Sequence, residues 1–112
     1  MHTIKAIKDQ FVDIRRMLRE APVPEALRDA AYVARLSEGV EEGYFSFNTA
    51  ISQESAWCRP CFSRRNSLRD VVVLLADLEN GAAVTSKTVT RMEAFPAEVD
   101  AIIAQIDTAL NA

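Results

Sequence analysis

The chain has 112 residues, 49% hydrophobic and 26% charged, the balance of an ordinary folded domain and not of a disordered chain. This length predicts a single domain, residues 1–112, because domains typically contain about 100–150 residues. The net charge of −3 argues against a protein that coats nucleic acid, since such proteins need a basic surplus to displace phosphate counterions. Three glycines and four prolines leave few turn residues, which favours a few long helices over many short strands.

No targeting or membrane segment is visible in the sequence. Residues 1–8 interleave isoleucine with lysine and lack the apolar block of a signal peptide. The longest apolar run, residues 71–76, is far shorter than the roughly 20 residues that span a bilayer. Two cysteines without a signal peptide suggest a reducing compartment, so we expect a cytoplasmic protein without membrane contact.

The first predicted helix covers residues 3–20. Its apolar residues recur at alternating spacings of three and four, which is the stripe of an amphipathic helix; they are Ile4, Ile7, Phe11, Ile14 and Leu18. Pro22 and Pro24 end the helix because proline lacks the backbone N–H that a continuing helix needs. A stripe of this kind packs against its own domain or against another chain. Ile7, Phe11, Ile14 and Leu18 are therefore predicted to form a core or dimer seam.

The second predicted helix begins at Pro24, since proline is favoured at the first helical position, and runs to about residue 54. Its apolar phase continues through Gly39 and Gly43. Each glycine costs roughly 1 kcal/mol relative to alanine inside a helix, so two helices with a joint near Gly43 are the alternative. We favour one long helix.

A third helix is predicted to follow the connecting segment 57–62, capped by Ser63 or Asn66 and ending at a left-handed Asn80-Gly81 cap. It is apolar nearly all round, which places Val72 and Leu75 in the core or in a dimer seam.

The carboxyl-terminal part is predicted to contain a short helix over residues 86–94 and a last helix that starts at Pro96. The predicted fold is therefore all-α: a compact bundle of four to five helices that forms a homodimer.

No complete set of catalytic or metal-binding residues is present, so we expect a protein without enzymatic activity, cofactor or metal. Trp57-Cys58-Arg59-Pro60-Cys61 resembles the thioredoxin active site, but the residues before it are polar where that fold needs a buried strand. His2 and the two cysteines are too few for a structural zinc site within one chain. A CxxC redox protein is accordingly the third interpretation.

A helix-turn-helix DNA-binding regulator is the second interpretation. Residues 68–79, a glycine-containing turn and residues 86–92 have the right outline, with Lys87 and Arg91 on the second helix. The acidic net charge and a connection of about six residues, longer than the usual three or four, disfavour direct nucleic-acid binding.

Binding to another protein is the favoured interpretation. Three aromatic residues within four positions cannot all point inward from one helix, and aromatic and arginine side chains are enriched at interface hot spots. The predicted partner-binding residues are Tyr44, Phe45, Phe47, Trp57, Phe62, Arg64 and Arg65. The alternative is that Tyr44 and Phe47 belong to the core and that Phe45 is an ordinary exposed apolar residue.

In size, helix content, the amino-terminal helix 3–20 and the long helix 24–54, the chain resembles the small anti-activators of LuxR-type quorum-sensing regulators, in particular the LasR-specific ones. The resemblance implies a dimer that binds the ligand-binding domain of such a regulator and covers its dimerisation surface. The regulator would then be unable to dimerise and to hold DNA.

Overall fold

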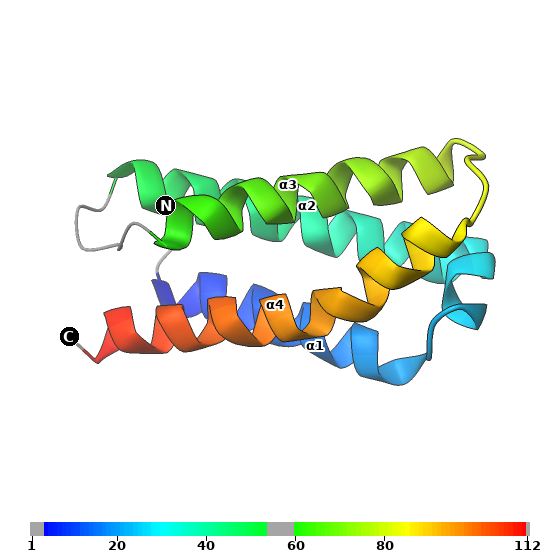
Figure 1. Cartoon of the computed structure of the whole chain (residues 1–112). Helices are drawn as coiled ribbons and strands as arrows, with labels where there is room; N and C mark the ends of the chain where they lie inside the picture. Colours follow the sequence, from blue (N-terminus) through cyan, green and yellow to red (C-terminus); the bar gives the residue numbers. More distant parts are fainter. Residues whose placement is uncertain (1–3, 54–59, 112) are drawn as a thin grey trace.

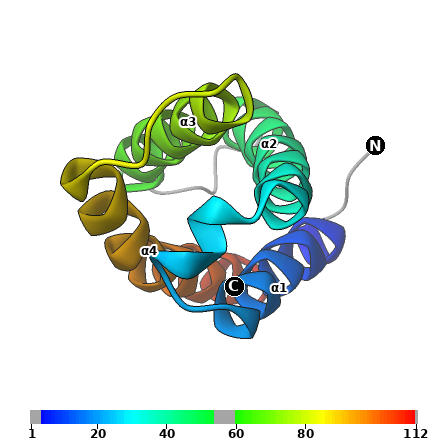
Figure 2. The same cartoon turned by 90° about the vertical axis from the view of Figure 1, so that its right-hand side faces the viewer.

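The computed structural model describes residues 4–53 and 60–111. They form four α-helices, α1 (Ile4–Glu20), α2 (Ala30–Gln53), α3 (Pro60–Glu79) and α4 (Ser86–Leu110), with a short 3-10 helix, η1 (Glu25–Arg28), between α1 and α2. The helices lie side by side along the long axis of a molecule of 41 × 23 × 22 Å (Figure 1). Viewed end-on in Figure 2, they surround one core in chain order, so that α4 also packs against α1. The predicted all-α bundle is confirmed.

The apolar stripe of α1 is buried within this chain. Ile7, Phe11 and Ile14 are almost completely inaccessible and face α2 and α4, while Leu18 is half-buried against the same core. On α3, Leu75 is fully buried and Val72 is half-buried. Core packing and a dimer seam are the two roles predicted for these six residues. The structure places all six in or against the core of their own domain.

The start of α2 differs from the prediction. Pro24 does not begin it; the chain makes the turn η1 first, and the helix starts at Ala30. The carboxylate of Asp29 accepts hydrogen bonds from the backbone N–H groups of Ala31 (3.1 Å) and Tyr32 (3.2 Å). Side-chain capping of this kind satisfies amide donors that have no partner in the first turn of a helix. The cap at Asp29 therefore determines where α2 begins.

Once started, α2 continues through both glycines as one helix, as predicted. The glycines face α1: a Cβ atom at Gly39 would lie 2.9 Å from Met17 Cε, and one at Gly43 would lie 3.1 Å from Ile14 Cδ1. Their missing side chains allow the two helix backbones to approach closely, which offsets part of their cost to the helix.

The first end of α3 differs from the prediction, and the second end agrees with it. The helix begins at Pro60, so neither Ser63 nor Asn66 is its cap; proline is favoured at a first helical position because its missing N–H has no intrahelical partner there. The other end matches the prediction. Gly81 has φ +96°, and Ala82 N–H bonds to the carbonyl of Asp77 (2.9 Å) while Gly81 N–H bonds to that of Leu78 (3.1 Å). These two bonds form a Schellman cap.

The predicted short helix and last helix are one continuous helix, α4, with Pro96 in its interior. A capping box between Thr85 and Thr88 starts it. Proline cannot donate to the carbonyl four residues earlier, and Figure 1 shows that α4 changes direction along its length. The prediction of a helix boundary at Pro96 is therefore wrong, and the described chain has four α-helices.

Ion pairs join α4 to α1 on the outside of the bundle. Lys8 Nζ lies 2.6 Å from Asp107 Oδ1, and Arg15 Nη1 lies 3.7 Å from Asp100 Oδ1. None of the helices in residues 4–53 and 60–111 has both the length and the apolar character needed to cross a membrane.

Candidate protein-binding surface

The three neighbouring aromatic residues of α2 point in different directions. Phe45 is 59% exposed, Tyr44 is half-buried against the core, and Phe47 is fully buried. Successive residues of a helix are rotated by about 100°, so residues 45 and 47 lie on opposite sides. The ring of Phe47 packs edge-on against Phe11 with centroids 5.8 Å apart. Its predicted place on a partner surface is corrected: Phe47 is a core residue.

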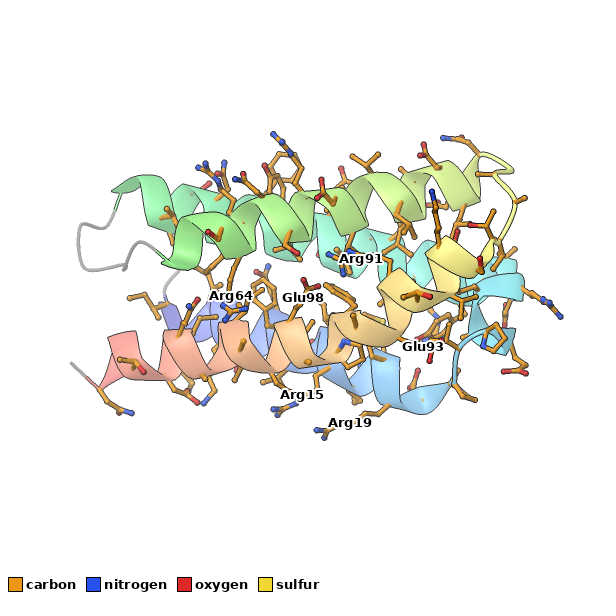
Figure 3. All side chains as sticks on the ribbon, viewed as in Figure 1. Arg15, Arg19, Arg64, Arg91, Glu93 and Glu98 are labelled. Atoms are coloured by element: carbon orange, nitrogen blue, oxygen red, sulfur yellow. The ribbon has the colours of Figure 1, made fainter. Side chains whose placement is uncertain are left out.

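The two predicted arginines also separate, to different sides of α3. Arg65 Nη1 donates to Asn48 Oδ1 on α2, at 3.3 Å. Arg64 instead lines a small cavity between α3 and α4, in the company of Glu98 (Figure 3). Adjacent residues of a helix are rotated by about 100°, so Arg65 can reach α2 while Arg64 is directed toward α4. The predicted grouping of Arg64 with the aromatic residues of α2 is corrected on this ground.

The remaining predictions fall where the structure gives no side-chain description. His2, Trp57 and Cys58 lie outside the described residues, and the side chains of Cys61 and Phe62 are not among those described. Partner binding by Trp57 and Phe62 therefore stays a prediction, and so does the expectation that the cysteines bind no metal; a CxxC redox role stays the third interpretation.

Two exposed apolar side chains, Phe45 of α2 and Val73 of α3, mark what we call the α2–α3 face, with the half-buried Tyr44 and Val72 next to them in the chain. Val73 is 53% exposed, and the Tyr44 and Phe45 rings are 5.8 Å apart. The helices run antiparallel (Figure 1), and the Arg65–Asn48 hydrogen bond sets their register. In that register Val73 lies about 7.5 Å further along the axis than Phe45, at 1.5 Å per residue. The two exposed side chains thus belong to two helices that pack against each other.

Charged residues border the α2–α3 face. Glu41 lies one helical turn before Phe45, and Arg69 lies one turn before Val73; both are exposed. Residues four apart share one side of a helix, so an acidic group borders the face on α2 and a basic group borders it on α3. An apolar centre with a charged rim is the usual anatomy of a protein–protein interface.

A second polar cluster lies between α3 and α4 and contains Ser67, Arg91 and Glu98. Ser67 Oγ donates to Glu98, but Arg91 occupies the same carboxylate at 2.7 Å. The space beside them that a water centre can occupy is about 10 Å³, which is room for about one water molecule. Arg91 thus already pairs with the carboxylate that accepts the Ser67 hydrogen bond, in a space that admits about one water molecule.

An open groove between α1 and α2 is no better a candidate for a ligand site than the cluster of Ser67, Arg91 and Glu98. Its charged side chains have mixed signs and are largely solvated; they include Asp13, Arg16, Arg35, Glu38 and Glu42. Within the described part of the chain, no three histidine, cysteine or acidic residues are grouped so as to hold a metal ion.

The geometry of α3 and α4 differs from that of a helix-turn-helix motif. The two helices of such a motif cross at about 90–120°, whereas α3 and α4 run roughly antiparallel beside each other (Figures 1 and 2). Arg91, a residue expected on the recognition helix, is held by Glu98 and Ser67.

The chain matches no family model, and no match is found among curated proteins or among solved structures. The α2–α3 face is therefore interpreted from its own geometry and residue types.

Proposed function

We propose that this chain is a non-catalytic protein-binding module and that the α2–α3 face contacts its partner. The exposure of Phe45 and Val73 carries the proposal. They are the large apolar side chains that stand exposed among those the structure describes. Burying such groups in an interface removes apolar surface from water, and truncating an aromatic hot-spot residue typically costs about 1–4 kcal/mol of binding free energy.

The partner we propose is a LuxR-type quorum-sensing regulator, bound through its ligand-binding domain so that it can neither dimerise nor hold DNA. The resemblance in size and helix content supports this assignment, together with an apolar face of the kind that can replace one subunit of a dimer. Replacing a subunit requires only that the new contact bind better than the regulator's own second copy. The α1 stripe does not contribute, because it is buried in the core of this chain.

A homodimer is part of the same proposal and would use the same surface. Since Phe45 and Val73 are the exposed large apolar residues of the described chain, a homodimer built on them would have to dissociate before the same face could bind a regulator. This differs from the resemblance, which implies that the dimer itself binds the regulator. We therefore expect sedimentation velocity at micromolar concentration to show a dimer that Phe45→Ala weakens.

The test is co-purification with the ligand-binding domains of LuxR-type regulators at physiological salt. We expect the wild-type chain to retain a regulator, and both Phe45→Ala and Val73→Ser to retain less of it. Thr108→Ala is the matched control, because Thr108 is an exposed residue of α4, which does not form part of the α2–α3 face. Failure to retain any regulator at micromolar concentration would sink the regulator assignment. Binding that is equal for Phe45→Ala and Thr108→Ala would contradict the role of the α2–α3 face.

A further inference from the structure

The contact between α3 and α4 is built differently from the other contacts in the bundle. It is the least extensive contact between neighbouring α-helices. Polar side chains also occupy its middle: Arg91 and Glu98 of α4 and Arg64 of α3 point into the space between the two helices (Figure 3). Arg64 Nε is buried there without a hydrogen-bond partner among the described residues. Apolar packing therefore contributes less to closing this pair of helices than to closing the rest of the bundle.

Arg91 makes most of the polar connections across this contact. Its Nη1 donates to Glu98 Oε2 at 2.7 Å, and its Nη2 donates to the carbonyl oxygen (3.0 Å) and the hydroxyl oxygen (2.9 Å) of Ser67. The Ser67 hydroxyl donates in turn to Glu98. One side chain thus ties α4 to α3 and also ties two separate turns of α4 together.

Pro96 lies between Arg91 and Glu98. Because proline has no N–H, the Met92 carbonyl loses its helical donor, and helices bend most readily at such positions. The Arg91–Glu98 ion pair therefore spans the weakest point of the α4 backbone. On the amino-terminal side of that point, Met92 and Phe95 are almost fully buried in the core.

We propose that residues 86–95 of α4 form a hinged arm, which moves about Pro96 and which Arg91 holds closed against α3. Opening of the arm uncovers Met92 and Phe95, together with Leu68 of α3, and so creates a second apolar surface that the closed structure covers. The Arg91 and Glu98 side chains are 27% and 28% exposed, so water weakens their ion pair and the arm opens at a lower cost than global unfolding. This inference does not depend on the proposed regulator.

Amide hydrogen exchange, followed by mass spectrometry on the full chain, tests the arm. In Arg91→Gln we expect exchange in residues 86–95 to become about tenfold faster, because hydrogen bonds to a charged group are lost, while α1 and α2 exchange as in the wild type. Arg15→Gln is the matched control: it removes an ion pair between α4 and α1 and should leave residues 86–95 unchanged.

Adding Pro96→Ala to Arg91→Gln restores the missing N–H and should slow exchange in the arm again. An equal increase in all four helices would show that Arg91 contributes only to general stability, and no increase in residues 86–95 would show that it holds nothing closed; either result overturns the hinge. If Arg91→Gln loses its helical circular dichroism, Arg91→Lys replaces it, since lysine keeps the charge but not the forked geometry. The same comparison then applies: exchange that is faster only in residues 86–95 supports the hinge, and exchange that is equally faster in all four helices overturns it.

Discussion

The Tyr32 hydroxyl donates a buried hydrogen bond of 2.7 Å to the Met17 carbonyl. Met17 lies in the last turn of α1, where backbone carbonyls have no intrahelical donor. Tyr32 belongs to the first turn of α2, so this bond fastens the two ends of the α1–α2 connection. Arg35 lies over the same ring, 5.8 Å from its centroid. The contact satisfies a carbonyl and orders the turn around η1.

This environment predicts how stability depends on alkaline pH. Burial, and then the Glu20 carboxylate, raise the pKa of Tyr32 above its ordinary value of 10.0, while Arg35 acts in the opposite direction. The folded state therefore holds the phenol proton more tightly than the unfolded chain. Its contribution to stability is complete below pH 10.0 and is lost as the pH rises from there through the folded pKa.

We expect Tyr32→Phe to lower the free energy of unfolding by about 1–3 kcal/mol at neutral pH, because the Met17 carbonyl loses its partner. The variant should also lose less stability than the wild type when the pH rises above 10.0. Urea unfolding of both chains across this range measures the difference. Parallel pH profiles would show that the Tyr32 proton is held equally in both states.

The two α2 glycines should respond differently to alanine. At Gly39 the nearest atom to a new Cβ is Met17 Cε, the mobile end of a flexible side chain. At Gly43 it is Ile14 Cδ1, with the Phe11 ring behind it, and both of these side chains are fully buried. We expect Gly39→Ala to stabilise by up to about 1 kcal/mol through helix propensity. Gly43→Ala should destabilise by about 1 kcal/mol, because overpacking exceeds that gain.

Thermal unfolding of the two variants beside the wild type measures this contrast. Equal shifts of Tm in the same direction would mean that the close approach of α1 and α2 does not depend on Gly43.

At the scale of the element, the end of α3 gives a clean test of backbone conformation. Gly81 has φ +96°, and a Cβ built there meets no atom within 4 Å. Any cost of Gly81→Ala therefore comes from the left-handed backbone and not from a clash. We expect a loss of about 1–2 kcal/mol, the usual cost of this conformation for an L-residue. Chemical denaturation measures it, with Ala82→Gly, at the next exposed position, as the control for a general effect of the turn.

Three prolines show why element boundaries were harder to predict than the elements. Pro24 was expected to begin α2, Pro60 to lie in a connection and Pro96 to begin a helix; they precede η1, begin α3 and lie inside α4. A proline inside a helix costs roughly 3 kcal/mol in isolation. In α4 the buried residues Phe95 and Val99 on either side of Pro96 offset that cost. This stabilisation depends on contacts with distant helices, which local sequence rules do not contain.

At the scale of the whole molecule, the division between core and surface predicts opposite outcomes for two phenylalanines. Phe47→Ala should lower the free energy of unfolding by about 3–5 kcal/mol, since it leaves a cavity beside Phe11. Phe45→Ala should change it by about 0.5 kcal/mol or less when the chain is dilute enough to be monomeric, because the Phe45 ring of the single chain is mostly in water already. Urea denaturation of the pair distinguishes them. A large loss in Phe45→Ala would mean that the α2–α3 face contributes to the fold and is not free for a partner.

The site was less predictable than the fold. Exposure of one of the three α2 aromatics follows from helical geometry, and Phe45 is that residue. Val73 was missed, because a helix that is apolar nearly all round gives no sign of which side the bundle leaves uncovered. Arg69 was missed for the same reason. The one available signal was its spacing of four residues from Val73, which becomes informative only when the exposed side of α3 is known.

The helical class, the continuity of α2 through its glycines and the left-handed end of α3 were determined by the sequence itself. Apolar spacing and glycine chemistry act over a few residues, so they can be read without knowing the neighbours. Only the tertiary structure decided that the α1 stripe packs inside its own domain, that Arg64 and Arg65 serve different sides of α3, and that α4 continues past Pro96. Each of these outcomes depends on which helix lies beside which, and that is set by contacts between residues far apart in the chain.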